Sequence, residues 1–289
     1  MKFTTDEFSY FPGCSLATTA KENNESLNSF LNYFDIKLNE INDWSCCGSS
    51  STHSVNSKLA LSLASRNLFL APEKQPMLIA CPGCFLRLGQ AKAELKKSKE
   101  KQNLYEQHFD KQFNHDLELV HFFELLNILN QKGLFKNYSN RLKGLKIAPY
   151  YGCMLATQSR ISDKHNHYGL IEKTVSSLGG QSIQWSFLSN CCGTFLSAGR
   201  PKIAEKLVNR IMEGAIRSGA ECIVTACAMC QLNLEIRCTL EKQLPTFHFS
   251  EILSLATMGK ASKDWFNRHL INPKPLLEQR QLSLCPAIA

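Results

Sequence analysis

One arrangement of ten cysteines, repeated along the chain, constrains the possible folds more than any other feature. Each copy has a single cysteine, then an adjacent pair, then a C-x2-C motif. The pair follows the single cysteine after 31 residues in the first copy and 37 in the second, and the C-x2-C motif follows the pair after 33 and 34 residues. The flanking residues Gly13, Gly48, Gly152 and Gly193 match as well. Spacing this similar predicts a duplicated domain.

Composition narrows the class of protein. The chain has 289 residues, of which 44% are hydrophobic, so it can bury a core, and disordered or fibrous classes are excluded. Its net charge of +8 is spread along the chain and does not indicate nucleic-acid binding. No apolar run is long enough for a membrane span, and the acidic start MKFTTDEFSY is unlike a signal peptide. In a reducing compartment, thirteen cysteines indicate metal binding rather than disulfides.

Strand and helix patterns alternate in both halves. This alternation predicts an α/β fold with a small parallel sheet in each half. Strands are expected near 7–12, 36–41, 76–80, 145–151, 181–187 and 222–226, and helices near 22–34, 53–70, 84–105, 161–178, 201–218 and 231–240.

The repeat also suggests domain boundaries. We expect a first domain over residues 1–107, a connector over 108–144, a second domain over 145–259 and a C-terminal tail over 260–289 that docks or wraps. The connector should carry an amphipathic helix around 117–129, and a similar helix is expected near 247–258. Either helix would be a candidate for contact with the other domain, a partner or a membrane surface.

The repeated cysteines all follow predicted strands, at the sheet edge where ligands bind in parallel sheets. A C-x2-C at a helix start can direct two thiolates at one centre, where the helix dipole stabilises negative charge. The pairs need a sharp turn, which Gly48 and Gly193 permit. Five thiolates in each half exceed the four that tetrahedral zinc accepts, so an iron–sulfur cluster is favoured over zinc.

Simpler interpretations explain the same residues less well. Buried structural thiols or paired zinc sites do not explain the adjacent pairs, and a thioredoxin-type redox pair does not explain the second copy. The lysine-rich stretch 96–101 is interpreted as a solvated helix end. The remaining cysteines and nearby histidines receive no role: Cys222, Cys238, Cys285, His53, His165 and His167.

These motifs resemble the CCG (cysteine-rich) domain, and their tandem arrangement is similar to the B-type subunit of heterodisulfide reductases. The resemblance covers nearly the whole chain and implies two pseudo-symmetric Rossmann-like domains, each with a non-cubane [4Fe–4S] cluster. Carried over by motif, the first cluster would be bound by Cys14, Cys46, Cys47, Cys81 and Cys84. The second would be bound by Cys153, Cys191, Cys192, Cys227 and Cys230.

The resemblance implies an oxidoreductase subunit that reduces or forms a sulfur–sulfur bond. Electrons would pass through partner subunits that carry cubane clusters and flavin, because this sequence has no ferredoxin-type C-x2-C-x2-C run and no dinucleotide-binding motif. The alternative is a quinone-reactive subunit of a succinate or fumarate reductase-type complex, and a third is an electron conduit in lactate or glycolate oxidation. The expected location is the cytoplasm or the inner face of the membrane. No catalytic side chain is assigned.

Overall fold

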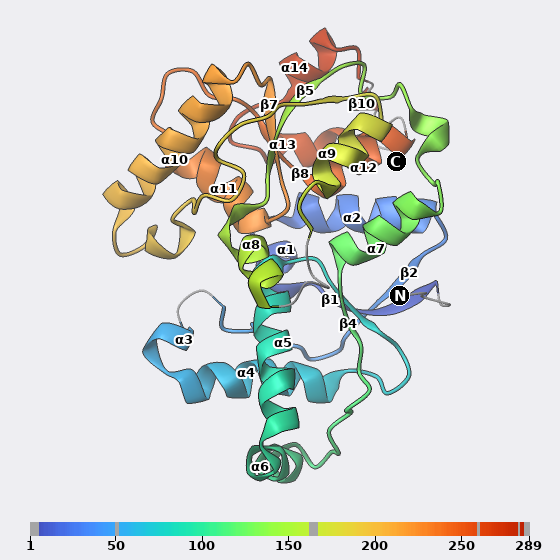
Figure 1. Cartoon of the computed structure of the whole chain (residues 1–289), viewed down its shortest axis with the longest axis vertical. Helices are drawn as coiled ribbons and strands as arrows, with labels where there is room; N and C mark the ends of the chain where they lie inside the picture. The colour runs from blue at the N-terminus through green and yellow to red at the C-terminus, as the bar shows by residue number, and fades with distance from the viewer. Residues whose placement is uncertain (1–5, 50–51, 162–166, 259–260, 283, 286–289) are drawn as a thin grey trace.

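The computed structural model describes residues 6–49, 52–161, 167–258, 261–282 and 284–285, and shows two α/β halves packed together (Figure 1). His165 lies outside the described residues. The first half contains β1 (Glu7–Phe11), α1 (Gly13–Ala17), α2 (Lys21–Tyr33), β2 (Lys37–Glu40), α3 (Thr52–Val55), α4 (Ser57–Leu70), β3 (Met77–Ile79), α5 (Pro82–Lys97), α6 (Lys99–Phe109), β4 (Leu119–His121), α7 (Phe122–Gln131) and the 3-10 turn η1 (Lys136–Tyr138).

The second half repeats the order of strands and adds a C-terminal segment. It contains β5 (Lys146–Tyr150), α8 (Gly152–Ile161), α9 (Leu170–Ser177), β6 (Gln181–Ser182), the 3-10 turn η3 (Thr194–Leu196), α10 (Pro201–Arg217), β7 (Cys222–Thr225), α11 (Ala228–Arg237), β8 (Thr246–His248) and α12 (Phe249–Met258). The C-terminal segment contains β9 (Ala261–Ser262), α13 (Lys263–Asn267), α14 (Lys274–Gln279) and β10 (Leu284–Cys285).

The two main sheets have the same topology. Their strand orders are β2-β1-β3-β4 and β6-β5-β7-β8, and every neighbouring pair is parallel. The first strand of each half is therefore an inner strand with its C-x2-C strand beside it. This confirms the predicted fold of two pseudo-symmetric α/β units with small parallel sheets.

The fourth strand of each sheet was not expected from the sequence. Helices were predicted around 117–129 and 247–258, but each of these segments begins with a short strand that ends in a histidine, His121 or His248. A short apolar run fits a buried strand as well as a helix start. Each histidine backbone N–H donates to a glutamate three residues later, Glu124 or Glu251, which caps the following helix. Segment 108–144 thus contributes a strand to the first sheet.

Two further predictions in the second half need correction. The helix expected near 161–178 is instead α8, which begins at Gly152, and α9, which begins at Leu170. The strand expected over 181–187 pairs with β5 only at its first two residues. The Ile183 N–H still donates to the Ile147 carbonyl of β5, but further along the chain the Leu188 carbonyl accepts hydrogen bonds from the N–H groups of Tyr151 and Gly152, beyond the end of β5.

The halves are held together by an interface centred on α2 and α12. Ser26 Oγ lies 2.7 Å from Ser250 Oγ across this interface, and Ser254 Oγ donates to the Ser26 carbonyl at 2.8 Å. Phe123 of α7 stacks on Phe249 of α12 with ring centroids 5.2 Å apart. The apolar faces of α7 and α12 are therefore buried within the protein, so neither helix presents them to a membrane.

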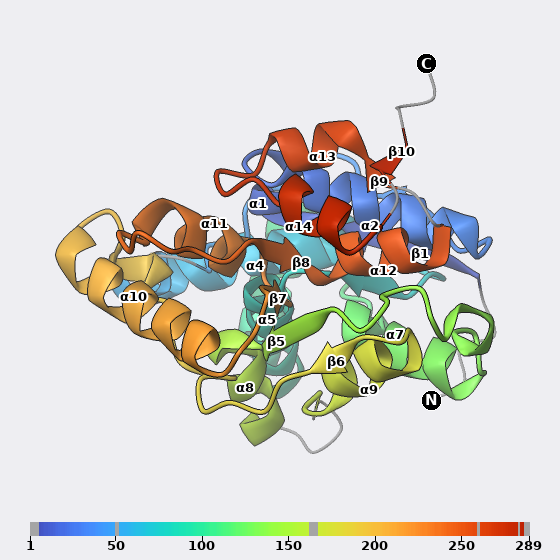
Figure 2. The ribbon, with the colours of Figure 1, turned by 90° about the horizontal axis from the view of Figure 1, so that it is seen from above.

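The C-terminal segment packs over both halves, with α13 lying against α2 (Figure 2). Arg268 pairs with Glu25 of the first half. The next residue, His269, is buried between Glu235 of α11 and Glu251 of α12, with ring nitrogens 3.1 Å and 2.8 Å from the carboxylate oxygens. Burial lowers the pKa of His269, but the two carboxylates outweigh this effect and raise it to about 10. The histidine is therefore charged and compensates two buried acids.

Replacing His269 by alanine should lower the free energy of unfolding by about 3–5 kcal/mol, because two buried carboxylates lose their cation. The folded-state pKa lies above the unfolded one, so the stabilisation is complete below about pH 6.5 and is lost as the pH rises through about 10. Urea unfolding between pH 6 and 10 measures both effects. The exposed His108 of α6 provides the control, since H108A should keep the wild-type stability and pH profile. Equal stability of H269A and wild type at pH 6 would contradict this role.

Candidate functional site

The structure brings the ten repeated cysteines into two groups, at the carboxyl ends of the two sheets. In each half the single cysteine follows the first strand, the pair lies in the loop after the second strand, and the C-x2-C motif follows the third. In the first half, Cys46 Sγ lies 3.6 Å from Cys14 Sγ, and Cys47 Sγ lies 3.2 Å from Cys84 Sγ. Cys81 interacts with Cys84, which completes the group.

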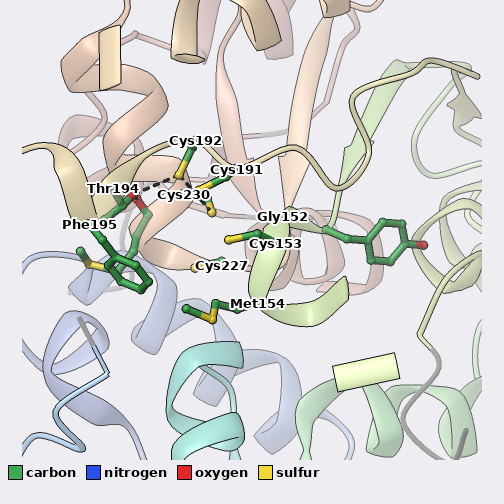
Figure 3. A pocket seen from close by; sticks show the side chains of 11 residues that line it. Gly152, Cys153, Met154, Cys191, Cys192, Thr194, Phe195, Cys227 and Cys230 are labelled. Carbon is green, nitrogen blue, oxygen red and sulfur yellow. Dashed lines mark hydrogen bonds between the residues drawn. The ribbon is translucent and has the colours of Figure 1, made fainter. Parts of the chain in front are cut away.

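The second group lines a single cavity (Figure 3). Cys192 Sγ lies 3.5 Å from Cys230 Sγ, and Cys153, Cys191 and Cys227 line the same space. Met154 and Phe195 lie on another side of the cavity. All five thiols of the second group therefore surround one volume, although they come from three separate segments.

Burial within each group follows the same order in both halves. The first cysteine of each pair, Cys46 or Cys191, is exposed, whereas the second, Cys47 or Cys192, is buried. The cysteines of both C-x2-C motifs are also buried. Each group therefore has a protein-facing side and a side open to solvent.

The paired cysteines lie on sharp turns, as predicted. Gly48 and Gly193 both have positive φ, +72° and +77°, a conformation that L-residues with side chains rarely adopt. The turn directs the glycine N–H back to the first sulfur of the pair, from Gly48 N to Cys46 Sγ at 3.5 Å and from Gly193 N to Cys191 Sγ at 3.3 Å. Backbone donors therefore stabilise thiolate charge at these positions.

The pKa values in the second group favour thiolates at the pair. The interaction with the Cys153 thiol lowers the pKa of Cys191 to about 6, and the interaction with Cys230 lowers that of Cys192 to about 7. The same contacts raise the pKa values of Cys153 and Cys230 above their ordinary range. The thiols thus share protons, as expected where several of them are crowded together.

Each C-x2-C motif opens a helix. Cys81 and Cys227 are the N-cap residues of α5 and α11, and Pro82 occupies the first turn of α5. The positive end of the helix dipole therefore lies at the sulfurs and favours negative charge there.

The glycine before each single cysteine has a role that the sequence did not reveal. Gly13 and Gly152 have φ of +73° and +69°. A Cβ atom on Gly13 would lie 2.8 Å from Cys84 Sγ, and one on Gly152 would lie 3.2 Å from Cys230 Sγ. Only glycine lets the backbone pass this close to the last cysteine of its group. The signal in the sequence was the Gly-Cys pair in both copies.

Buried asparagines that fix the loops of the pairs were also missed. Asn67 of α4 binds both the N–H and the carbonyl of Ser45, each at 2.9 Å. Asn233 of α11 donates to the Cys192 carbonyl at 2.7 Å. The two asparagines come from different helices, so the duplication in the sequence could not identify them.

A hydroxyl follows each Cys-Cys-Gly turn. Thr194 Oγ1 lies 3.0 Å from Cys192 Sγ and 3.1 Å from the Met229 carbonyl oxygen. At the matching position, Ser49 Oγ is buried without a hydrogen-bond partner among the described residues. A Cβ atom added to Gly83, which lies in the C-x2-C motif, would be 2.7 Å from this Ser49 Oγ. Both hydroxyls are therefore close to the sulfur groups.

The two cysteine groups face the interface between the halves. Helix α1, which carries Cys14, packs against α11, whose first turn holds Cys230. Conversely α8, which carries Cys153, packs against α5, whose first turn holds Cys84. The structure thus relates the groups by the same pseudo-symmetry that the sequence repeats.

The atoms that surround each site indicate which inorganic group it could bind. Within the described parts of the chain, no group of three or more His, Cys, Asp or Glu side chains is arranged to hold a metal ion. In the second half the fit rests on the five sulfurs around one cavity and on Gly152, which leaves room beside Cys230. In the first half it rests on the close sulfur contacts, Gly13 beside Cys84 and the buried Ser49 hydroxyl. A sulfur-only donor set with nearby N–H and O–H donors suits an iron–sulfur cluster.

The residues left without a role are not members of the two sulfur groups. Cys222 is buried in β7, and Cys238 ends α11. His53 lines a groove between α4 and α5, and His167 packs beside His121 with ring centroids 5.3 Å apart. The side chain of Cys285 lies outside the described part of the structure.

Comparison with known proteins identifies relatives along almost the whole chain. The family profile "Cysteine-rich domain" (CCG) matches residues 8–89 and 147–235. The chain is 30% identical over 281 residues to the 8-methylmenaquinol:fumarate reductase membrane anchor subunit of Wolinella succinogenes, covering 93% of this chain and 99% of that protein. It is 25% identical to the B-type subunit of the ferredoxin:CoB-CoM heterodisulfide reductase of Methanosarcina mazei, covering 87% and 89%.

A solved structure supports the fold. A hypothetical protein from Helicobacter pylori matches with a TM-score of 0.68 at 14% identity, over 92% of this chain and 52% of that one, so the chain spans about half of its length. Within the residues that the structure describes, no helix is both long and apolar enough to cross a membrane.

Replacing Gly152 by alanine should displace Cys230 and disrupt only the second group, because the added Cβ would lie 3.2 Å from its sulfur at a φ that alanine disfavours. Thiol titration of the unloaded protein and iron content after reconstitution measure the effect. G13A should do the same to the first group. Gly89, whose added Cβ meets nothing within 4 Å, provides the control through G89A. Full iron content in G13A and G152A would contradict the proposed close approach.

Proposed function

Because the chain belongs to the cysteine-rich (CCG) domain family, we propose that it is an iron–sulfur electron-transfer subunit of a multi-subunit reductase complex that acts on a quinol or, as in heterodisulfide reductases, on a disulfide. The observation that carries the proposal is the convergence of five cysteine sulfurs in each half, on either side of one interface. Each group would hold one non-cubane [4Fe–4S] cluster. The ligands would be Cys14, Cys46, Cys47, Cys81 and Cys84 in the first half, and Cys153, Cys191, Cys192, Cys227 and Cys230 in the second.

When bound, the clusters would supply one-electron transfer. The chain's own residues determine the surroundings of the sulfurs. The N–H groups of Gly48 and Gly193 donate to cysteine sulfurs, and the helix starts at Cys81 and Cys227 favour negative charge. Such donors raise the reduction potential of a sulfur-bound centre because they stabilise its more negative form.

The complex would include partner subunits that carry cubane clusters and flavin. Both named relatives are subunits of larger reductases, and this sequence has no ferredoxin-type cysteine run of its own. The exposed cysteines Cys14, Cys46 and Cys191 mark the sides of the groups from which electrons could reach such partners.

Two reactants fit a protein with two matching one-electron sites. A disulfide takes up two electrons and two protons to become two thiols, and a quinol releases two electrons and two protons to become a quinone. Sulfur–sulfur chemistry is supported by the similarity to the B-type subunit of a heterodisulfide reductase. Quinol chemistry is favoured by a specific observation, the 30% identity to a methylmenaquinol:fumarate reductase subunit over 99% of its length. We therefore place the quinol first.

The deciding experiment uses the complete complex, purified without air. It compares oxidation of a reduced menaquinone analogue with reduction of small-molecule disulfides. Turnover of the quinol alone supports the quinol-reactive subunit, whereas turnover of disulfides alone supports the heterodisulfide reductase type. If neither is turned over by a complex with full iron content, both proposed reactants are wrong.

Each half should bind its cluster independently. C47S and C192S should each reduce the iron content from about eight to about four atoms per chain, because each removes a buried ligand from one group only. Iron and acid-labile sulfide analysis of anaerobic protein measures the loss. The matched control is C238A, which removes a buried cysteine outside both groups and should retain about eight. Unchanged iron in both serine variants would refute the ligand assignment.

The Thr194 hydroxyl should tune the second site. T194V removes a hydroxyl 3.0 Å from Cys192 Sγ, whose proton is also within reach of the Met229 carbonyl. With Cys192 deprotonated as a ligand the sulfur can only accept, so loss of this O–H donor should lower the midpoint potential of the second centre relative to wild type. A redox titration followed by electron paramagnetic resonance measures the shift. T194S keeps the hydroxyl and should restore the wild-type potential. A potential that is the same in T194V and wild type would show that this hydroxyl does not act on the centre.

A further inference from the structure

We propose that two cationic apolar segments, one after each cysteine pair, bind the anionic lipid surface of a membrane. The first is the α3–α4 segment, defined here by Val55, Lys58 and Leu59. The second is the η3–α10 segment, defined by Phe195, Leu196, Arg200, Lys202, Ile203 and Lys206. The inference rests on the proposed function, since a lipid surface is where a quinol would be found.

The exposed apolar side chains of the protein concentrate in these segments. Of the ten large hydrophobic residues exposed in the described part of the chain, five lie here. Val55 is 85% exposed, and Leu59, Phe195, Leu196 and Ile203 are between 38% and 49% exposed. Large apolar side chains gathered at the surface mark sites of contact with another molecule or a membrane.

Positive charge accompanies these side chains. Lys58 is exposed next to Leu59, and Arg200, Lys202 and Lys206 are exposed around Ile203. Residues 52–59 include no acid, and residues 194–206 include only Glu205, which is half-buried and accepts a hydrogen bond from Thr239. Both segments therefore combine protruding apolar groups with a local excess of cations.

The two segments occupy matching places beside the sulfur groups. Each begins within seven residues of the glycine of its Cys-Cys-Gly turn, and the first cysteine of each pair is exposed. In Figure 1, α3 and α10 lie on the same side of the molecule, to the left of α5 and α8. A membrane on this side of the molecule would contact both segments, each of which follows an exposed cysteine along the chain.

Composition favours lipid over a protein as the occupant. Protein interface cores are enriched in aromatic residues and arginine and depleted in lysine. Here three of the four cations are lysines, and four of the five apolar residues are aliphatic. Lysine with protruding aliphatic side chains is typical of proteins that lie on anionic lipid, where the apolar groups enter the headgroup boundary and the lysines remain at the phosphates.

The test measures binding of the iron-loaded full chain to vesicles by co-sedimentation. Wild type should bind vesicles of mixed phosphatidylglycerol and phosphatidylcholine, and binding should weaken in pure phosphatidylcholine and in high salt. The triple variant K202E/I203S/K206E should bind about tenfold more weakly or worse. V55S/K58E/L59S tests the first segment in the same way.

The matched control is K96E/K97E/L104S, which makes the same changes in charge and apolar character on α5 and α6. It should bind within about twofold of wild type. The proposal is overturned if wild type does not bind anionic vesicles, if neither segment variant loses binding, or if the control loses as much. It is also overturned in favour of a protein occupant if the segment variants dissociate from other subunits while vesicle binding is unchanged.

Failure of the proposed function would look different. The segment variants should keep full iron content and oxidise a water-soluble quinol analogue as wild type does. If wild type binds anionic vesicles but oxidises no quinol, the quinol assignment fails and the lipid-binding surface stands.

Discussion

Parallel pairing of strands is the constraint on which the site depends. Each half must bring cysteines from three distant segments to one place, and a parallel sheet does this because the carboxyl ends of its strands meet at one edge. Backbone geometry then completes the convergence. Gly13 and Gly152 let the turn after the first strand pass within contact distance of the C-x2-C sulfur, which a side chain at either position would prevent.

The two halves have matching structures around the sulfur groups but differ away from them. Behind the second C-x2-C motif, Glu235 and Glu251 enclose the charged His269 of the C-terminal segment. In the first half, the position that matches Glu235 is Gly89, and Phe85, next to the last C-x2-C cysteine, packs edge-on against the His121 ring with centroids 5.3 Å apart. The buried ion pair of the second half therefore has no matching acid at the Glu235 position in the first. The matching arrangement near the sulfurs and the different supports behind them indicate that the sulfur geometry is the shared functional element.

The apolar helix faces that the sequence pattern suggested for membrane contact are buried, and other apolar side chains are exposed. Helices α7 and α12, which looked like candidates for contact with a membrane, bury their apolar faces at the interface and hold the halves together. Half of the large apolar side chains exposed in the described part of the chain lie instead in the segments that follow the cysteine pairs. Electron transfer to an external reactant requires such an arrangement, because the reactive sulfur side must be accessible while the rest of the group is shielded from water.

The sequence by itself determined the duplication, the parallel α/β class, the ten cysteines of the repeat and the glycine turns at the pairs. These features are local or periodic, so spacing and residue type reveal them. Tertiary structure alone decided that β4 and β8 complete the sheets, because a three-residue apolar run does not distinguish strand from helix. It also decided which apolar helices are buried, how close Gly13 and Gly152 come to sulfur, and that His269 lies between two acids. These properties depend on contacts between residues far apart in the chain, which no local pattern records.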